Sequence, residues 1–195
     1  MTESDILIEI SGAVTGLLYV YLEIIQKRSM WIVGALSAIA YIIIFGSKGL
    51  YGATLLQCYF LIMSVYGWIT WGMENKQGGG ESSKQGVRKL SLFVLLLSFL
   101  LSAIFYFIIS RILILTGEDP MPKADALATV LSITATFWVT RRYRENWLLW
   151  IAVNLISLYI YLNQGLYPTS ILYAVYTVAA VAGYIHWRKF RQLVV

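Results

Sequence analysis

Long apolar runs separated by short polar segments dominate the pattern of this chain. A membrane-spanning helix needs about 20 predominantly apolar residues. Seven segments reach or approach that length, so the pattern predicts an all-α integral membrane protein with seven transmembrane helices. The predicted spans are Ile6–Ile25, Met30–Ser47, Leu50–Gly72, Leu90–Ser110, Ala124–Thr140, Asn146–Asn163 and Tyr167–Trp187.

The first and fifth spans are the least apolar of the seven. Glu9 and Glu23 shorten the charge-free part of the first span, and Asp125 with several Ser and Thr residues dilutes the fifth. We expect Glu23 to pair with Lys27 one helical turn on, and Glu9 and Asp125 to lie near the outer ends. No acidic residue is then expected at mid-membrane depth, which favours passive movement over ion coupling.

The chain contains an internal repeat. A shift of 116 residues aligns Trp31 with Trp147 and Trp71 with Trp187 without a gap, with ten identities in the 41 paired positions. Four spans separate corresponding helices, so the two halves run the same way through the membrane. The sequence predicts a parallel 3+1+3 repeat, an arrangement known from small transporters. The predicted parts are a first three-helix repeat at 6–72, a cytoplasmic linker at 73–89, a connector helix at 90–110 and a second three-helix repeat at 124–187.

Composition and charge add an orientation to this picture. The chain is 59% apolar and only 13% charged, which is typical of a membrane protein. Twelve of its fifteen Lys and Arg residues lie on one side of the predicted bilayer. Because basic residues near helix ends remain cytoplasmic, the N-terminus is predicted outside and the C-terminus in the cytoplasm. The net charge of +5 is therefore a topology signal and does not indicate nucleic-acid binding.

Two tryptophans and an amide share one stripe of the sixth predicted helix. Trp147, Trp150 and Asn154 are spaced i, i+3 and i+7, which places them on one helix face. Trp147 has a tryptophan as its counterpart in the first repeat, whereas Gly34 and Ala38 correspond to Trp150 and Asn154. This asymmetry indicates that the stripe contacts a ligand.

A second polar face is predicted on the third helix. Gln57, Ser64 and Trp68 lie within about 40° of one direction on a helix of 3.6 residues per turn. The seventh helix adds three tyrosines to the candidate substrate-binding residues. They are Tyr173, Tyr176 and Tyr184. The two halves are expected to present facing walls of amide, hydroxyl and aromatic groups. An interhelical hydrogen bond is the alternative role of Gln57.

The candidate residues favour a ligand with a cationic aromatic ring and hydroxyl or amino groups, since indole faces attract cations and amides orient polar groups. A sugar carrier of the same architecture is an alternative, although sugars lack a cation.

An enzyme is not predicted, because Ser157 and His186 are not spaced to meet on one helix. No metal cluster or cofactor is predicted, and a retinal protein would need a lysine within 167–187. A non-transporting receptor would use the same pocket, but the chain has no signalling domain.

The sequence resembles the PnuC family of bacterial vitamin transporters. The resemblance rests on the run from Arg141 to Trp150 with Asn154 in the pattern W-x-x-W-x-x-x-N, and on the segment from Leu50 to Trp71. It covers all seven spans and implies a SWEET-like 3+1+3 fold in the bacterial inner membrane, often as a homotrimer.

The same resemblance implies facilitated diffusion of an unphosphorylated vitamin, which a cytoplasmic kinase then traps. It also implies that Trp147, Trp150, Asn154 and Gln57 contact the substrate. Members of the family carry nicotinamide riboside, thiamine in those called PnuT, or riboflavin or deoxynucleosides. This chain lacks the N-terminal extension common in nicotinamide riboside members, and Leu172 stands where some of them have an acidic residue. Both differences favour thiamine, with nicotinamide riboside as the alternative.

Overall fold

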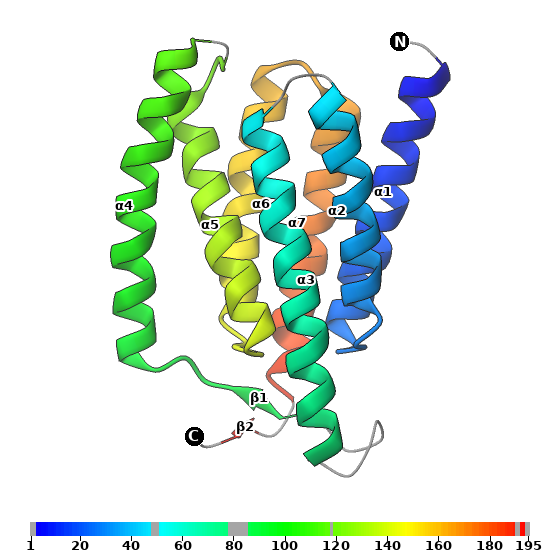
Figure 1. The fold of residues 1–195 in the computed structure, drawn as a ribbon, viewed down its shortest axis with the longest axis vertical. Coiled ribbons are helices and arrows are strands. Elements are labelled where there is room, and N and C mark those ends of the chain that lie inside the picture. The colour runs from blue at the N-terminus through cyan, green and yellow to red at the C-terminus, as the bar shows by residue number, and fades with distance from the viewer. Residues whose placement is uncertain (1–2, 48–50, 78–85, 118, 190–191, 194–195) are drawn as a thin grey trace. The chain divides into compact units, whose positions relative to one another are not determined.

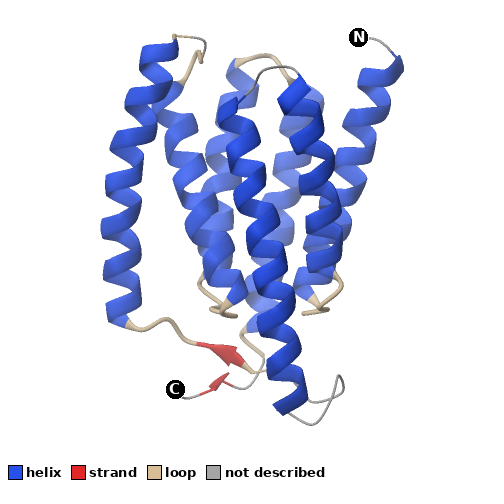
Figure 2. Ribbon diagram, viewed as in Figure 1, coloured by secondary structure: helices blue, strands red, loops and turns tan. Residues whose placement is uncertain are grey.

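The computed structural model describes residues 3–47, 51–77, 86–117, 119–189 and 192–193, and this part of the chain is almost entirely helical (Figures 1 and 2). Its elements are α1 (Glu3–Ile24), α2 (Met30–Ser47), α3 (Tyr51–Gln77), β1 (Val87–Arg88), α4 (Leu92–Thr116), α5 (Pro122–Thr140), α6 (Asn146–Asn163), α7 (Tyr167–Trp187) and β2 (Gln192–Leu193). The predicted seven-helix, all-α fold is confirmed.

The chain divides into two compact units, Met1–Gln85 and Gly86–Val195. In the first unit, α2 packs against both α1 and α3. In the second, α4 packs against α5, α5 against α6 and α6 against α7, and the short strands β1 and β2 pair in parallel (Figure 2). The predicted connector helix is therefore part of the second unit, and the predicted division into two three-helix repeats stays a prediction.

Four helices of the described chain are long and apolar enough to cross a membrane. They are Ala53–Met73 within α3, and α4, α6 and α7. α1 and α2 contribute shorter apolar stretches, Ser11–Ile24 and Met30–Gly46. α4 is by far the most apolar, with a mean hydropathy of 2.8 against 1.3–1.4 for the other three, and Ser110 is its one buried residue.

Two helices extend past the ends predicted from hydropathy. α3 continues to Gln77, through the polar residues after Gly72, and α4 continues from Ser110 to Thr116. Hydropathy marks where a chain leaves the apolar layer, whereas the helix itself continues until a stop signal. For α4 that signal is Gly117, whose φ of 69° suits glycine and whose N–H donates to the Leu113 carbonyl at 3.3 Å. Of the predicted linker, residues 78–85 lie outside the described chain.

The internal repeat is visible as a matching pair of tryptophan contacts. Trp31 of α2 meets Trp71 of α3 edge to face, with ring centroids 5.5 Å apart and an interplanar angle of 89°. Trp147 of α6 meets Trp187 of α7 at 5.6 Å and 87°. All four rings are fully buried. The sequence repeat therefore corresponds to a repeated packing motif, one copy in each unit.

A glycine makes each tryptophan contact possible. A Cβ atom on Gly183 would lie 2.6 Å from three ring atoms of Trp147, and a Cβ on Gly67 would overlap the equivalent ring of Trp31. Real Cβ atoms do not approach other atoms so closely. Glycine at these two positions lets the indole lie flat on the neighbouring helix.

The turn between the first two helices of each repeat is also conserved in geometry. Gln26 and Arg142 occupy corresponding positions, and both have left-handed backbones with φ of 55° and 56°. In each turn the N–H of the following residue donates to the carbonyl five residues back, at 2.9 Å and 3.0 Å. These are Schellman helix ends.

The predicted pair between Glu23 and Lys27 does not form. α1 ends at Ile24 and the chain reverses at Gln26, so Lys27 no longer lies one helical turn above Glu23. Glu23 is buried in the turn, and Lys27 points to the surface. The i, i+4 rule applies only where the helix continues through both residues.

Candidate functional site

The predicted α6 stripe combines a packing residue, Trp147, with residues that have no such packing role, although the buried Nε1–H groups of Trp147 and Trp150 both lack a hydrogen-bond partner in the described chain. Trp147, at the start of the helix, is only 1% exposed and lies against Trp187 and Gly183. Trp31 has the same surroundings in the first unit. The fold accounts for Trp147, and its contact with a substrate stays a prediction.

Three polar groups follow on the same face of α6. The Trp150 Nε1–H is buried, and Asn154 and Ser157 are 6% and 7% exposed. Of the three, the Trp150 Nε1–H is a buried polar atom without a hydrogen-bond partner in the described part of the chain. Because a buried polar group without a partner costs free energy, this stripe is suited to a ligand that supplies the missing hydrogen bonds.

Hydroxyl groups on the neighbouring helices behave differently. Hydroxyls on α5 and α7 donate to carbonyls of their own helix, at 2.8–3.1 Å, and so satisfy themselves. These residues are Ser132, Thr134, Thr136, Ser170 and Thr177. Such self-satisfied hydroxyls are common in apolar helices. The polar groups of the α6 stripe form no such bonds.

Trp150 occupies a position that is filled differently in the first unit. Its counterpart, Gly34, lies where Tyr19 of α1 and Ser64 of α3 approach, so that a Cβ on Gly34 would be 3.0 Å from each side chain. In the second unit the matching residues are Ala135, Trp150 and Ala180. In the first unit the large side chain at this place is Tyr19, on the first helix of the repeat. In the second unit it is Trp150, on the second helix, and alanines correspond to Tyr19 and Ser64.

Tyrosines extend the site along α6 and α7. The ring of Tyr161 lies 5.1 Å from that of Tyr173, which meets Tyr176 edge to face at 5.7 Å. Two of these three residues were predicted from the sequence. Tyr161 was missed, as was Ser157 as a site residue, although both continue the stripe of Trp150 and Asn154 at helical spacing.

The polar face of α3 lies in the first unit. Ser64 is 5% exposed, and Gln57 and Trp68 are half-buried. Within the described residues neither Gln57 nor Ser64 has a hydrogen-bond partner, so the interhelical bond considered for Gln57 is not seen there. That the α3 and α7 faces oppose one another stays a prediction.

An arginine lies over an aromatic ring near the C-terminal end of α3 and another near the C-terminal end of α7. The Cζ atom of Arg28 lies 3.7 Å from the centroid of the Trp68 ring, and that of Arg188 lies 6.0 Å from the centroid of Tyr184. Sequence reasoning missed both, because basic residues beside apolar helices were interpreted only as topology signals.

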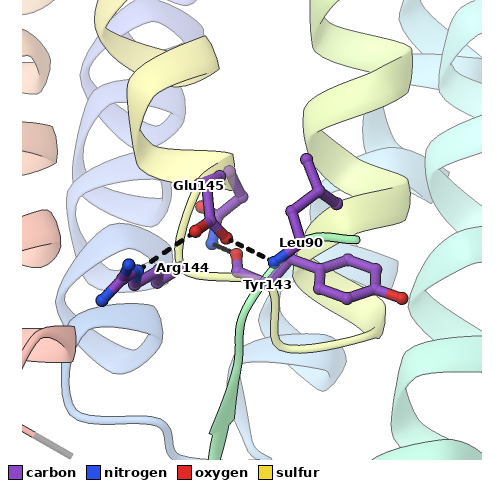
Figure 3. Close-up of polar contacts among 5 residues, drawn as sticks. Leu90, Tyr143, Arg144 and Glu145 are labelled. Atoms are coloured by element: carbon purple, nitrogen blue, oxygen red, sulfur yellow. Dashed lines mark hydrogen bonds and ion pairs between the residues drawn. The ribbon is translucent and has the colours of Figure 1, made fainter. Parts of the chain in front are cut away.

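The turn before α6 fixes where the stripe begins (Figure 3). Glu145 accepts two hydrogen bonds, from the Leu90 N–H at 3.2 Å and from Arg144 Nε at 3.1 Å. The fully buried Asn146 donates through Nδ2 to the Tyr143 carbonyl at 2.6 Å. These bonds hold the start of α6 against the segment that leads into α4.

No group of three or more His, Cys, Asp or Glu residues in the described part of the chain could hold a metal ion.

Comparison with known proteins gives the same picture along nearly the whole chain. A family model described as nicotinamide mononucleotide transporter matches residues 6–189. The chain is 31% identical to the nicotinamide riboside transporter PnuC of Escherichia coli strain K12, over 92% of this chain and 84% of that protein. It is 27% identical to the nicotinamide riboside transporter PnuC of Neisseria mucosa, over 91% of this chain and 70% of that protein.

The fold is similar to that of a solved structure. The crystal structure of the vitamin B3 transporter PnuC has a TM-score of 0.75 and 26% sequence identity to this chain, and the match covers 96% of this chain and 83% of that one. The matched part, 96% of this chain, is longer than either unit alone.

Proposed function

Because the chain belongs to the nicotinamide mononucleotide transporter family, whose members are multi-pass membrane transporters and not enzymes, we propose that it carries nicotinamide riboside by facilitated diffusion. The membrane would be the bacterial inner membrane, with the basic helix flanks on the cytoplasmic side. A cytoplasmic kinase that phosphorylates the imported nicotinamide riboside would keep its internal concentration low and so maintain the inward gradient.

The observation that carries this proposal is the polar stripe on α6, in which the buried Trp150 Nε1–H has no hydrogen-bond partner in the described chain. Nicotinamide riboside has a cationic aromatic ring, a carboxamide and a ribose with hydroxyl groups. The Trp150 indole suits the ring, and Asn154 and Ser157 can exchange hydrogen bonds with the carboxamide or the hydroxyls. The side chains of Trp150, Asn154 and Ser157 thus each have a counterpart on the ligand.

The distribution of acidic residues supports diffusion without ion coupling. Glu23 is the buried acidic residue among those described, and it lies in the last turn of α1, away from the middle of the helix. Proton and sodium pathways rely on ionisable groups at membrane depth. The α6 stripe is built from uncharged groups.

The preference for thiamine drawn from the sequence is less well supported than the nicotinamide riboside alternative. It rested partly on Leu172, an apolar residue on α7. The relatives compared above are named as nicotinamide riboside transporters. Thiamine, which also has a cationic ring, becomes the competitor against which the proposal is tested.

Equilibrium binding to the purified protein tests the cargo. Nicotinamide riboside, its 5′-phosphate and thiamine are each titrated while the quenching of tryptophan fluorescence is followed. We expect nicotinamide riboside to bind at least about tenfold more tightly than either of the others. Tighter binding of thiamine would overturn the proposed cargo and restore the thiamine prediction.

A further inference from the structure

We propose that Arg28 is a gate residue that competes with the cationic substrate for the indole face of Trp68. The proposal rests on the proposed function, because it requires a substrate with a cationic ring. It assigns a role to a residue outside the α6 stripe, in the turn between α1 and α2.

Three contacts hold the Arg28 side chain on α3. Its Cζ atom lies 3.7 Å from the centroid of the Trp68 ring, and its Nε donates to the Trp68 carbonyl at 2.8 Å. The guanidinium also rests against Gly72, where an added Cβ would come within 2.5 Å of it. The cation therefore has one defined position, over the ring face.

The backbone of the turn places Arg28 for this contact. Gln26 takes the left-handed conformation that ends α1, and the Arg28 carbonyl accepts the N–H of Trp31 at 3.1 Å at the start of α2. Both neighbouring helices thus fix the point from which the side chain reaches α3. The contact follows from the turn geometry and from the glycine at position 72.

Trp68 belongs to the same helix face as the partnerless polar groups of α3. Gln57, Ser64 and Trp68 follow one another along that face, and Arg28 covers the last of them. A cationic ring that moved along the face would find an indole at its end with a guanidinium already in place. Since indole faces bind a cation through the ring quadrupole, the two cations compete for one surface.

The second repeat reaches a similar arrangement from different positions in the sequence. Tyr184 corresponds to Trp68, and the arginine near its ring, at 6.0 Å, is Arg188, which corresponds to Gly72. Arg144, the counterpart of Arg28, is instead paired with Glu145 at 3.1 Å. Each unit therefore places a guanidinium near the last aromatic residue of the face, although different residues supply it.

The strength of the contact suits a gate. A cation over an indole is held more weakly than one paired with a buried carboxylate, so an arriving cation of similar affinity can displace it. Removing the guanidinium should then raise the affinity for cationic ligands and leave neutral ligands unaffected.

The test compares nicotinamide riboside with its reduced dihydro form, which has nearly the same shape and no charge. Binding of both is measured for the wild-type protein and for Arg28→Gln, Arg28→Lys and Trp68→Leu. We expect Arg28→Gln to bind the cation about three- to tenfold more tightly and to leave the affinity for the neutral form within about twofold. Arg28→Lys, which keeps a positive charge, should lie nearer the wild type.

Lys27→Gln is the matched control, because it removes one exposed positive charge from the neighbouring position. It should leave the ratio of the two affinities unchanged. In the Trp68→Leu background, Arg28→Gln should have no further effect on that ratio, since the surface for which the cations compete has gone.

The inference is overturned if Arg28→Gln changes both affinities equally, weakens cation binding, or is matched by Lys27→Gln. Any of these results would mean that Arg28 acts through stability or general charge. If the wild-type protein binds no nicotinamide riboside, the proposed function fails first, and that result is distinct from binding with an unchanged ratio.

Discussion

Trp147 and Trp150 lie one helical turn apart and have different surroundings. Trp147 is buried against Trp187 and Gly183, in a contact that the first unit repeats. Trp150 and Asn154 have a glycine and an alanine as counterparts, so the first unit cannot repeat their contacts, although the buried Nε1–H groups of Trp147 and Trp150 both lack a partner in the described chain. The symmetric residue serves the scaffold, and the asymmetric residues are left for a ligand.

Replacement of Trp150 or Asn154 by alanine should weaken binding while the protein stays folded. Each change removes a ring contact or hydrogen bonds to the ligand, so we expect a loss of roughly 1–3 kcal/mol, about five- to 150-fold in affinity. Leu155→Ala, at an exposed position on the same helix, is the control and should bind normally. Titration of nicotinamide riboside measures the effect, and normal binding by both variants would show that the stripe only packs.

The sequence could predict Trp150 and Asn154 because the repeat showed them to be unmatched. It did not predict the role of Arg28, since a charged residue at a helix flank gives the same pattern whether it points to solvent or lies on a ring. The Arg28 side chain reaches Trp68 because the chain turns at the left-handed Gln26 and because Gly72 has no side chain to block the guanidinium.

At the scale of elements, close contact between paired helices depends on the glycine beneath each buried tryptophan. Gly67 lies under Trp31, and Gly183 lies under Trp147. Interfaces of small residues let helices approach in membranes, where lipid tails are as apolar as the side chains and the hydrophobic effect contributes little. The contact is therefore a packing interaction that a single methyl group can disrupt.

Gly183→Ala should destabilise the second unit by about 1–3 kcal/mol, because the added Cβ overlaps the Trp147 ring and the core must shift. A thermal unfolding experiment in detergent measures this as a lower Tm. Gly46→Ala is the matched control, since a Cβ at that position meets no atom within 4 Å. Equal Tm values for Gly183→Ala and the wild type would contradict the packing account.

Glu145 links the start of α6 to the segment before α4. Glu145→Ala removes the acceptor of the Leu90 N–H, so exchange of that amide with solvent should quicken by about tenfold, the effect of losing one hydrogen bond of roughly 1–2 kcal/mol. Lys89→Gln, at an exposed position next to Leu90, should leave the exchange rate unchanged. Hydrogen exchange followed by mass spectrometry checks both variants, and an unchanged rate in Glu145→Ala would exclude the link.

Element types were more predictable than element ends. Seven apolar runs predicted seven helices, because the length of an apolar run is set by the bilayer. α3 and α4 extend further than predicted because polar residues can continue a helix beyond the apolar layer. The strands β1 and β2 were not predicted, since two-residue strands leave no periodic pattern in a sequence.

At the scale of the whole molecule, the chain has the fold and the family of bacterial vitamin transporters. The sequence was sufficient for that assignment, because the 116-residue repeat and the W-x-x-W-x-x-x-N pattern of α6 can both be read from it directly. It was not sufficient for the cargo, since thiamine and nicotinamide riboside both offer a cationic ring to the same indole. Nicotinamide riboside differs from thiamine in its carboxamide and its ribose hydroxyls, which polar side chains such as Asn154 and Ser157 could recognise.

The central claim is that the protein lets nicotinamide riboside equilibrate across a membrane. Uptake of labelled nicotinamide riboside into liposomes that contain the purified protein tests it directly, with and without proton or sodium gradients and with unlabelled thiamine as competitor. We predict that the internal concentration rises to the external value and no further, that ion gradients have no effect, and that equimolar thiamine inhibits only slightly. Accumulation above the external concentration in the presence of a gradient, or uptake of thiamine alone, would contradict the account.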